Sequence, residues 1–336
     1  MSRVYAFQNT VEEVMRSSSG GAFIAICKAF EEMHGAGNVV FYGATYGDNM
    51  QVEHRGVFSA QECSIFQGSK YVKSKCKMDD LGIADELNQG KAILFSGTPC
   101  QVHAFNIYIK KYEPFEEKIL TIDIICHGTP KVEFWNAYKE WLEKKNKSKM
   151  VAYSFRYKPQ GWKAYPAYAE FENGKVLVNA AETSVFSKMH MARYSINKGC
   201  FSCPFSKEER VSDITLGDFW GIEKLLPKMN YKTGVSLVLS HSDDADSLIE
   251  HLAQNEEYFC RETKRRDYIK YQHNLNKPTE KPVNYEQFWS DFSTISFEKI
   301  LQKYVGYGLK YRVFFCIKKV IRKTPLIEWY RNRKTK

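Results

Sequence analysis

The sequence lacks any apolar run near the roughly 18–20 residues that a helix needs to span a bilayer. It also lacks an apolar segment after its first residues, so no signal peptide is expected. No repeat recurs at a period of about 20–50 residues, which argues against solenoids and propellers. With 336 residues, 43% of them apolar, we expect a folded cytoplasmic protein with a full core.

Net charge is missing from most of the chain. The overall charge of +10 comes from residues 296–336, which hold 12 Lys and Arg against Glu298 and Glu328, while residues 1–295 carry 37 groups of each sign. A neutral body predicts no nucleic-acid partner, since that would need a basic face. The basic segment predicts peripheral contact with an anionic membrane or another acidic partner, or else a solvated terminal helix.

The nine cysteines of a cytoplasmic chain do not predict a disulfide framework. Cys27, Cys260 and Cys316 lie among apolar and aromatic residues, which indicates small core side chains. Cys63 and Cys76 lie in mixed polar segments and receive no predicted role.

The other four cysteines lie beside Gly, Pro or Ser residues that mark loops. Cys200 and Cys203 have the spacing at which two thiolates bind one metal centre. Cys100 and Cys126 each end an apolar, strand-like run, and loops at the carboxyl ends of parallel strands meet in one crevice of an open α/β sheet. We therefore predict that all four form one metal site. Their spacing does not distinguish an iron–sulfur cluster from structural zinc.

Two polar loops are candidates for binding a phosphorylated cofactor. The first feeds a helix expected over residues 22–33 and presents backbone N–H groups and hydroxyls, which suits a phosphate or pyrophosphate. Ordinary helix capping by serine is the alternative. The second offers a cation and hydroxyls to a phosphate or a flavin ring. The residues predicted to contact the cofactor are Ser17, Ser18, Ser19, Gly20 and Gly21 in the first loop and Ser69, Lys70 and Tyr71 in the second.

A third loop carries Thr98, Pro99 and Gln101, which we also assign to the cofactor. It joins an expected strand over residues 91–95 to a helix over residues 102–112, the arrangement of a cofactor-binding crevice. Since the G-x-G-x-x-G spacing is missing, the sequence does not predict an ordinary dinucleotide-binding fold.

The expected fold is α/β (mixed α+β), an open sheet with βα units and an antiparallel hairpin insertion. The hairpin is predicted over residues 165–178, because Asn173-Gly174 is a strong two-residue turn signal. A mobile loop with one tryptophan, Trp162, is expected over residues 158–163. Trp135 and Trp141 have helical spacing and are interpreted as packing residues.

Six segments together resemble the coenzyme F-420 hydrogenase/dehydrogenase beta-subunit family over nearly the whole chain. Six markers in the right order are far more specific than any one of them. They are Ser17-Ser-Ser-Gly-Gly-Ala-Phe23, Gly68-Ser-Lys-Tyr71, Gly97-Thr-Pro-Cys-Gln101, Cys126-His-Gly128, Cys200-Phe-Ser-Cys203 and Asp213-Ile-Thr-Leu-Gly-Asp-Phe-Trp-Gly221.

The resemblance implies a flavin-dependent oxidoreductase with FAD (or FMN) and a 4Fe-4S cluster. Such a protein passes electrons between a two-electron carrier, a deazaflavin or another small-molecule hydride donor or acceptor, and a one-electron partner. The cluster would be held by Cys100, Cys126, Cys200 and Cys203. We name no catalytic acid or base, because the cofactors carry the chemistry.

The chain departs from the family in one respect. No cysteine precedes Cys27, so the N-terminal ferredoxin-like segment of such proteins is not expected here, and the one-electron partner would be a separate ferredoxin-like protein. The expected parts are an N-terminal α/β part with the flavin-binding loops (1–148), a C-terminal α+β part with the CxxC motif (149–295) and a basic helical tail (296–336).

Two alternatives remain open from the sequence. The first is a zinc-stabilised binding or scaffold protein for a phosphorylated ligand. Bacterial relatives of the family often appear with polysaccharide-assembly enzymes, so polysaccharide assembly is one setting for such a scaffold. The second is a flavoprotein without a cluster.

Overall fold

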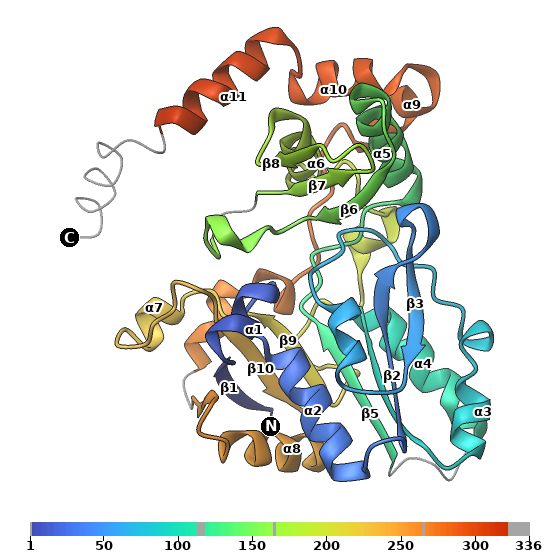
Figure 1. Cartoon of the computed structure of the whole chain (residues 1–336), viewed down its shortest axis with the longest axis vertical. Coiled ribbons are helices and arrows are strands. Elements are labelled where there is room, and N and C mark those ends of the chain that lie inside the picture. Colours follow the sequence, from blue (N-terminus) through green and yellow to red (C-terminus); the bar gives the residue numbers. More distant parts are fainter. Residues whose placement is uncertain (1, 113–117, 164–165, 264–265, 322–336) are drawn as a thin grey trace.

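The computed structural model describes residues 2–112, 118–163, 166–263 and 266–321 (Figure 1). Its strands are β1 (Arg3–Gln8), β2 (Val39–Tyr46), β3 (Val52–Val57), β4 (Ala92–Gly97), β5 (Ile119–Ile124), β6 (Met150–Ser154), β7 (Tyr168–Phe171), β8 (Val176–Val178), β9 (Ile214–Asp218), β10 (Ser236–Ser240) and β11 (Phe259–Glu262). Its α-helices are α1 (Val11–Arg16), α2 (Ala22–His34), α3 (Ile83–Asn88), α4 (Pro99–Ile109), α5 (Val132–Asn146), α6 (Ala181–Met191), α7 (Ile222–Leu225), α8 (Asp243–Ala253), α9 (Tyr285–Thr294), α10 (Phe297–Val305) and α11 (Leu309–Ile321).

Eight strands form one large sheet in the order β11-β1-β10-β9-β5-β4-β2-β3. The four central strands β9, β5, β4 and β2 are parallel to their neighbours within this group, whereas β1, β3, β10 and β11 pair antiparallel at the two flanks. The predicted α/β fold with an open sheet is therefore confirmed.

Helices cover both faces of the parallel strands. Successive β2 residues alternate between two cores, with Phe41 packed with α2 and α8 residues and Tyr42 packed with α3 and α4 residues. A strand buried on both faces needs apolar residues throughout, which is why β2, β4 and β5 were visible in the sequence as continuous apolar runs.

A second layer lies above the carboxyl edge of the parallel strands in the view of Figure 1. It consists of the antiparallel sheet β6-β7-β8 with α5, α6, α9 and α10 around an aromatic core. Trp135 is fully buried there, which confirms its predicted packing role. The predicted hairpin is the β7–β8 pair, with Gly174 at a φ of +77°, although residue 165 lies outside the described residues.

The structure also differs from the expectations. Strands β1, β9 and β11 had not been predicted, and β1 and β11 pair with segments more than 200 residues away in sequence. Cys316 is exposed on α11, so its assignment to the core was wrong.

Ile300 and Leu301 of α10 are fully buried in the aromatic core, and the large sheet takes strands from both sides of residue 148. Residues 322–336 of the predicted basic tail lie outside the described residues.

Candidate functional site

The turn after β4 places Cys100 in the first turn of α4. Thr98 is the N-cap, and Pro99 is the first helical residue, where a missing N–H costs nothing. The side-chain oxygen of Gln101 accepts hydrogen bonds from the Thr98 amide (3.0 Å) and hydroxyl (2.8 Å), while Thr98 Oγ1 lies 3.2 Å from Cys100 Sγ. Gln101 Nε2 donates to Ser74 Oγ at 2.8 Å. Thr98 and Gln101 therefore hold the shape of the cysteine turn.

The loop after β5 brings Cys126 to the CxxC segment. Asn197 donates through its backbone N–H (3.0 Å) and side-chain Nδ2 (2.7 Å) to the Thr129 carbonyl, and its own carbonyl accepts from the Cys200 amide at 3.0 Å. Gly128 has a φ of +97°, and a Cβ there would lie 3.3 Å from Cys200 Cβ and 2.7 Å from Ile196 Cγ2. The glycine of Cys126-His-Gly128 is thus required for the close approach of the two loops.

The thiols of all four predicted ligands lie close enough to interact electrostatically. Burial raises the pKa of Cys126 to about 12, with further contributions from Cys200, Cys100 and Cys203, while a hydrogen bond from Gly128 opposes the shift. Burial likewise raises the pKa of Cys200, with smaller effects from Cys100 and Cys203. Segments that are about 100 residues apart in sequence therefore converge at the carboxyl edge of β4 and β5.

A buried arginine that sequence analysis missed ties the CxxC segment to this edge. Arg210 donates to the Phe205 carbonyl (2.7 Å) behind Cys203 and to the Ile124 carbonyl (3.2 Å) two residues before Cys126. Its Nη2 also forms an ion pair with Asp123 Oδ2 at 3.0 Å, where both side chains are almost completely buried. Burial raises the pKa of Asp123, and Arg210 opposes that shift. The only sequence signal was an aspartate inside an apolar strand.

The serine–glycine loop of residues 17–21 is packed against β1 and β10. The Gly20 amide donates to Ser236 Oγ (2.9 Å), and the Ser19 hydroxyl donates to the Val235 carbonyl (2.8 Å). A Cβ on Gly20 would lie 2.2 Å from the Phe7 carbonyl oxygen. This glycine is therefore needed for backbone packing, and its amide already has an acceptor.

The two predicted cofactor loops lie side by side. Ser18 Oγ accepts hydrogen bonds from the backbone N–H (2.8 Å) and hydroxyl (3.0 Å) of Ser69, and Ser17 Oγ accepts from Gln67 at 3.1 Å. The hydroxyl hydrogens of Ser17 and Ser18 have no acceptor among the described residues, so both can still donate to a ligand.

Lys70 closes the end of a short 3₁₀ helix, Glu62–Phe66. Its ammonium donates to the carbonyls of Ile65 (3.1 Å), Phe66 (3.0 Å) and Gln67 (2.9 Å). Burial lowers the pKa of this lysine to about 7. An ammonium has three N–H donors, and these three carbonyls account for all of them.

The segment over residues 158–163, predicted as a mobile loop around Trp162, is held to the body through two buried side chains, Lys158 and Trp162, while Pro159, Gly161 and Lys163 are exposed. Lys158 donates to the carbonyls of Val14 (2.6 Å) and Ser19, and burial lowers its pKa to about 7. Trp162 is buried and stacked on Trp220, with ring centroids 4.9 Å apart. Lys158 and Trp162 therefore hold this loop in place through contacts with residues 14, 19 and 220.

A buried ion pair joins the second layer to the end of β9. Arg156 Nη1 contacts Asp218 Oδ2 at 2.6 Å, and Asp218 Oδ1 accepts from Trp162 Nε1 at 2.9 Å. Next to it, Tyr71 of the second cofactor loop stacks on His190, with centroids 4.9 Å apart, and interacts with Arg156. Of these residues, only Tyr71 was a predicted site residue. The others come together only because the two sheets meet.

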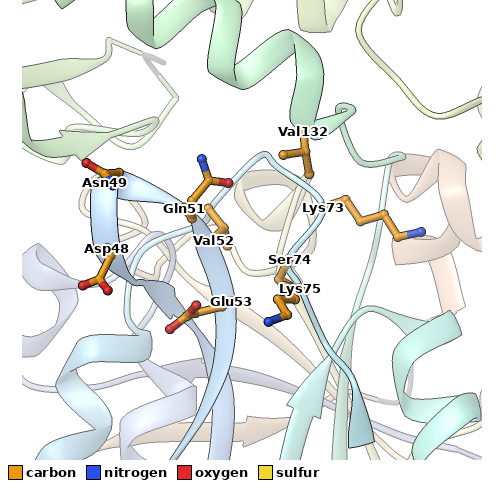
Figure 2. Close-up of a pocket in the computed structure, with 9 residues that line it drawn as sticks. All are labelled: Asp48, Asn49, Gln51, Val52, Glu53, Lys73, Ser74, Lys75 and Val132. Carbon is orange, nitrogen blue, oxygen red and sulfur yellow. The ribbon is translucent and has the colours of Figure 1, made fainter. Parts of the chain in front are cut away.

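A pocket of about 630 Å³ opens beside this junction (Figure 2). Figure 2 shows β3 on one side, the segment of residues 73–75 on the other and Val132 of α5 above, with Lys73 pointing away from the other labelled side chains. Its lining carries charges of both signs, including Asp48, Glu53 and Lys75. Ser74 of the lining is the hydrogen-bond partner of Gln101, so the pocket adjoins the cysteine turn.

Known proteins provide an independent view of this arrangement. The family defined by the C terminus of the coenzyme F420 hydrogenase/dehydrogenase beta subunit matches residues 90–266, which is more than half of the chain. The chain belongs to this family. The matched residues of this beta-subunit family member include all four predicted ligand cysteines and Arg210, but neither of the loops at residues 17–21 and 68–71. Hydrogenases and dehydrogenases are oxidoreductases, so the general class of the chain is that of redox proteins.

A chain of the F420-reducing [NiFe] hydrogenase complex from Methanosarcina barkeri, solved as a xenon derivative, has a similar fold. The two are 15% identical with a TM-score of 0.55, and the match covers 86% of this chain and 92% of the other. At this identity, the likeness concerns the fold. The curated proteins contain no match to this beta-subunit family member.

The chemistry of the donor set bears on the kind of metal centre that it fits. Across the described residues, no three His, Cys, Asp or Glu side chains are close enough together to hold a single metal ion. The loops that carry the four cysteines nevertheless meet at the carboxyl edge of β4 and β5. Four cysteines are the donor set that both a 4Fe-4S cluster and a structural zinc ion take, so the residue types fit either centre. No helix among the described residues is long and apolar enough to cross a bilayer.

Proposed function

We propose that this chain is a flavin-dependent iron–sulfur oxidoreductase that passes electrons between a two-electron carrier and a ferredoxin-like one-electron partner. The two-electron carrier is a deazaflavin or another hydride donor or acceptor. The observation that carries the proposal is the convergence of Cys100, Cys126, Cys200 and Cys203 at one edge of the sheet in a member of this redox family.

In this proposal, the four cysteines hold the 4Fe-4S cluster, and the surrounding residues position them. Gly128 lets the Cys126 and Cys200 loops approach, and Arg210 holds the segment after Cys203 against β5. When bound, the flavin and the cluster together supply the conversion between two-electron and one-electron transfer.

The flavin is assigned to the junction of the two layers. Ser17 and Ser18 offer hydroxyls that suit a phosphate, and Tyr71 follows Ser69 of the neighbouring loop with Arg156 close by. The amide of Gly20 and the ammonium of Lys70 already have acceptors, so they support the loops rather than supply free donors. Contacts from the other predicted cofactor residues remain predictions.

The first test is the absorption spectrum of anaerobically purified protein, with flavin, iron, zinc and acid-labile sulfide assayed on the same sample. We expect flavin bands over a broad iron–sulfur shoulder, with iron and sulfide present. A colourless protein with stoichiometric zinc would overturn the redox proposal in favour of a scaffold. Flavin bands without iron would overturn the cluster assignment.

Matched cysteine variants make the test specific. Cys203→Ser should remove iron and sulfide, whereas Cys316→Ser, which changes an exposed cysteine on α11, should retain both. Equal iron content in the two variants would exclude Cys203 as a ligand. The carrier is then tested by adding reduced deazaflavin and recording whether the flavin bands bleach and recover on addition of oxidised ferredoxin.

A further inference from the structure

The last described helix, α11, has an inner face that is anchored to the second layer. Tyr311 forms a 2.7 Å hydrogen bond with Ser184 of α6, and Phe315 packs on the aromatic core. Near its end, Lys319 donates to the carbonyls of Val178 (3.0 Å) and Asn179 (3.1 Å). The helix is therefore held in one orientation, which determines the side that faces outward.

Large apolar side chains cover that outward side. Leu309 is 77% exposed, Val313 50%, Phe314 66% and Ile317 51%. Their spacing of four, one and three residues places all four within one broad face of an α-helix. Figure 1 shows α11 extending outward from the end of α10, and the exposed fractions of these four side chains show that the described residues leave this face largely uncovered. Apolar surface gathered in this way marks an interaction site rather than a scatter of single residues.

Positive charge surrounds the apolar face. Residues 309–321 contain no Asp or Glu, and Lys310, Arg312 and Lys318 are exposed. The sequence that follows, residues 322–336, contributes six more Lys and Arg against Glu328, whereas residues 1–295 are neutral. Basic charge beside an exposed apolar helix face complements an anionic lipid surface, where cations attract headgroups and apolar side chains enter the acyl boundary.

We propose that the outward face of α11 docks on an anionic lipid bilayer, with the helix lying in the plane of the interface. Leu309, Val313, Phe314 and Ile317 enter the bilayer, and the flanking Lys and Arg side chains contact the headgroups. This attachment holds the redox body at a membrane surface without a spanning segment. It is independent of the cofactors, so it does not rest on the proposed function.

The test is flotation of the full-length protein with vesicles of phosphatidylcholine containing about 30% phosphatidylglycerol, compared with vesicles of phosphatidylcholine alone. We expect binding to the anionic vesicles that weakens as salt is raised. Phe314→Glu should reduce binding about tenfold or more, because one large apolar side chain no longer enters the bilayer. The matched control is Val283→Glu, which changes a fully exposed apolar residue in a loop and should bind as the unaltered protein does.

Three results would overturn the proposal. The first is no binding to anionic vesicles at low salt. The second is equal binding by Phe314→Glu, since the attraction would then come from charge alone. The third is a concentration-dependent dimer that Phe314→Glu abolishes in the absence of lipid, because a second copy would then cover the face. Circular dichroism and cofactor content of both variants show whether the body has stayed folded.

Discussion

The cysteine edge and the serine–glycine loop of residues 17–21 are built in opposite ways. Around the cysteines, the structural contacts are made by residues other than the predicted metal ligands, such as Gln101, Gly128 and Arg210. In the serine–glycine loop, residues predicted to bind the cofactor make the structural contacts themselves, since Gly20 packs between β1 and β10 and Ser19 donates to the Val235 carbonyl. A motif residue can serve a ligand only with groups that folding has not already used.

The largest expected effect is a difference in stability between alanine variants of two glycines, one in each cofactor loop. Gly20→Ala places a Cβ 2.2 Å from the Phe7 carbonyl oxygen and 2.4 Å from the Ser236 nitrogen, both of them backbone atoms in the sheet. We expect a loss of more than about 4 kcal/mol in the free energy of unfolding, measured by urea denaturation.

Gly68→Ala is the control for that variant. Gly68 has a φ of +79°, but a Cβ at this position would have no atom within 4 Å of it, so only backbone strain of about 1–2 kcal/mol is expected. Equal losses for the two variants would contradict the packing role given to Gly20.

The next effect concerns the cysteine edge. Arg210→Met removes the partner of Asp123 and leaves a buried carboxylate without its counter-charge. Breaking a buried ion pair in this way costs about 3–5 kcal/mol, and it should also lower the iron content because the CxxC segment loses its anchor. Urea denaturation and an iron assay measure the two effects.

A double variant tests whether the pair itself is responsible. Asp123→Asn combined with Arg210→Met removes both charges, so at least half of the lost stability should return. If the two single losses simply added, the residues would not be coupled and the ion pair would not be the source of the lost stability.

A smaller effect depends on pH at the junction of the layers. Burial lowers the pKa of His190 to about 4, whereas an unfolded histidine titrates near 6.5. Between these values the unfolded state binds more protons, so stability falls as pH falls from about 6.5 to 4, by up to about 1.4 kcal/mol per pH unit. Above pH 6.5 this histidine is neutral in both states, so it no longer makes stability depend on pH.

His190→Phe should therefore flatten the dependence of urea midpoint on pH between about 6.5 and 4. The ring can keep its stack on Tyr71, and the Nδ1 atom that is removed has no hydrogen-bond partner among the described residues. An unchanged slope would mean that His190 is protonated equally easily in the folded and unfolded states.

The smallest expected effect is that of Lys70→Met. If the ammonium only holds the three carbonyls at the end of the 3₁₀ helix, the variant should lose about 1 kcal/mol of stability and keep its flavin. Ser18→Ala is the comparison, and it should lose flavin because its hydroxyl is free to donate. Loss of flavin from Lys70→Met would instead support the sequence-based prediction that Lys70 binds the cofactor.

Local patterns were sufficient for several elements. The apolar runs of β2, β4 and β5 and the Asn173-Gly174 turn carry their information in adjacent residues, and each was found in the structure. Trp162 shows where local patterns fail. Its neighbours Pro159, Gly161 and Lys163 look like an exposed loop, but stacking on Trp220 buries it, and that partner lies 58 residues further along the chain.

The sequence by itself determined the fold class, the loops that carry the cysteines and the uneven distribution of charge, because these follow from spacing, side-chain period and composition. Only the tertiary structure decided which polar and charged groups already have partners within the protein. It paired Arg210 with Asp123 and Arg156 with Asp218, gave Lys70 three carbonyl acceptors and turned one face of α11 outward. The physical reason is that burial, ion pairing and hydrogen bonding depend on neighbours brought together by long-range strand pairing.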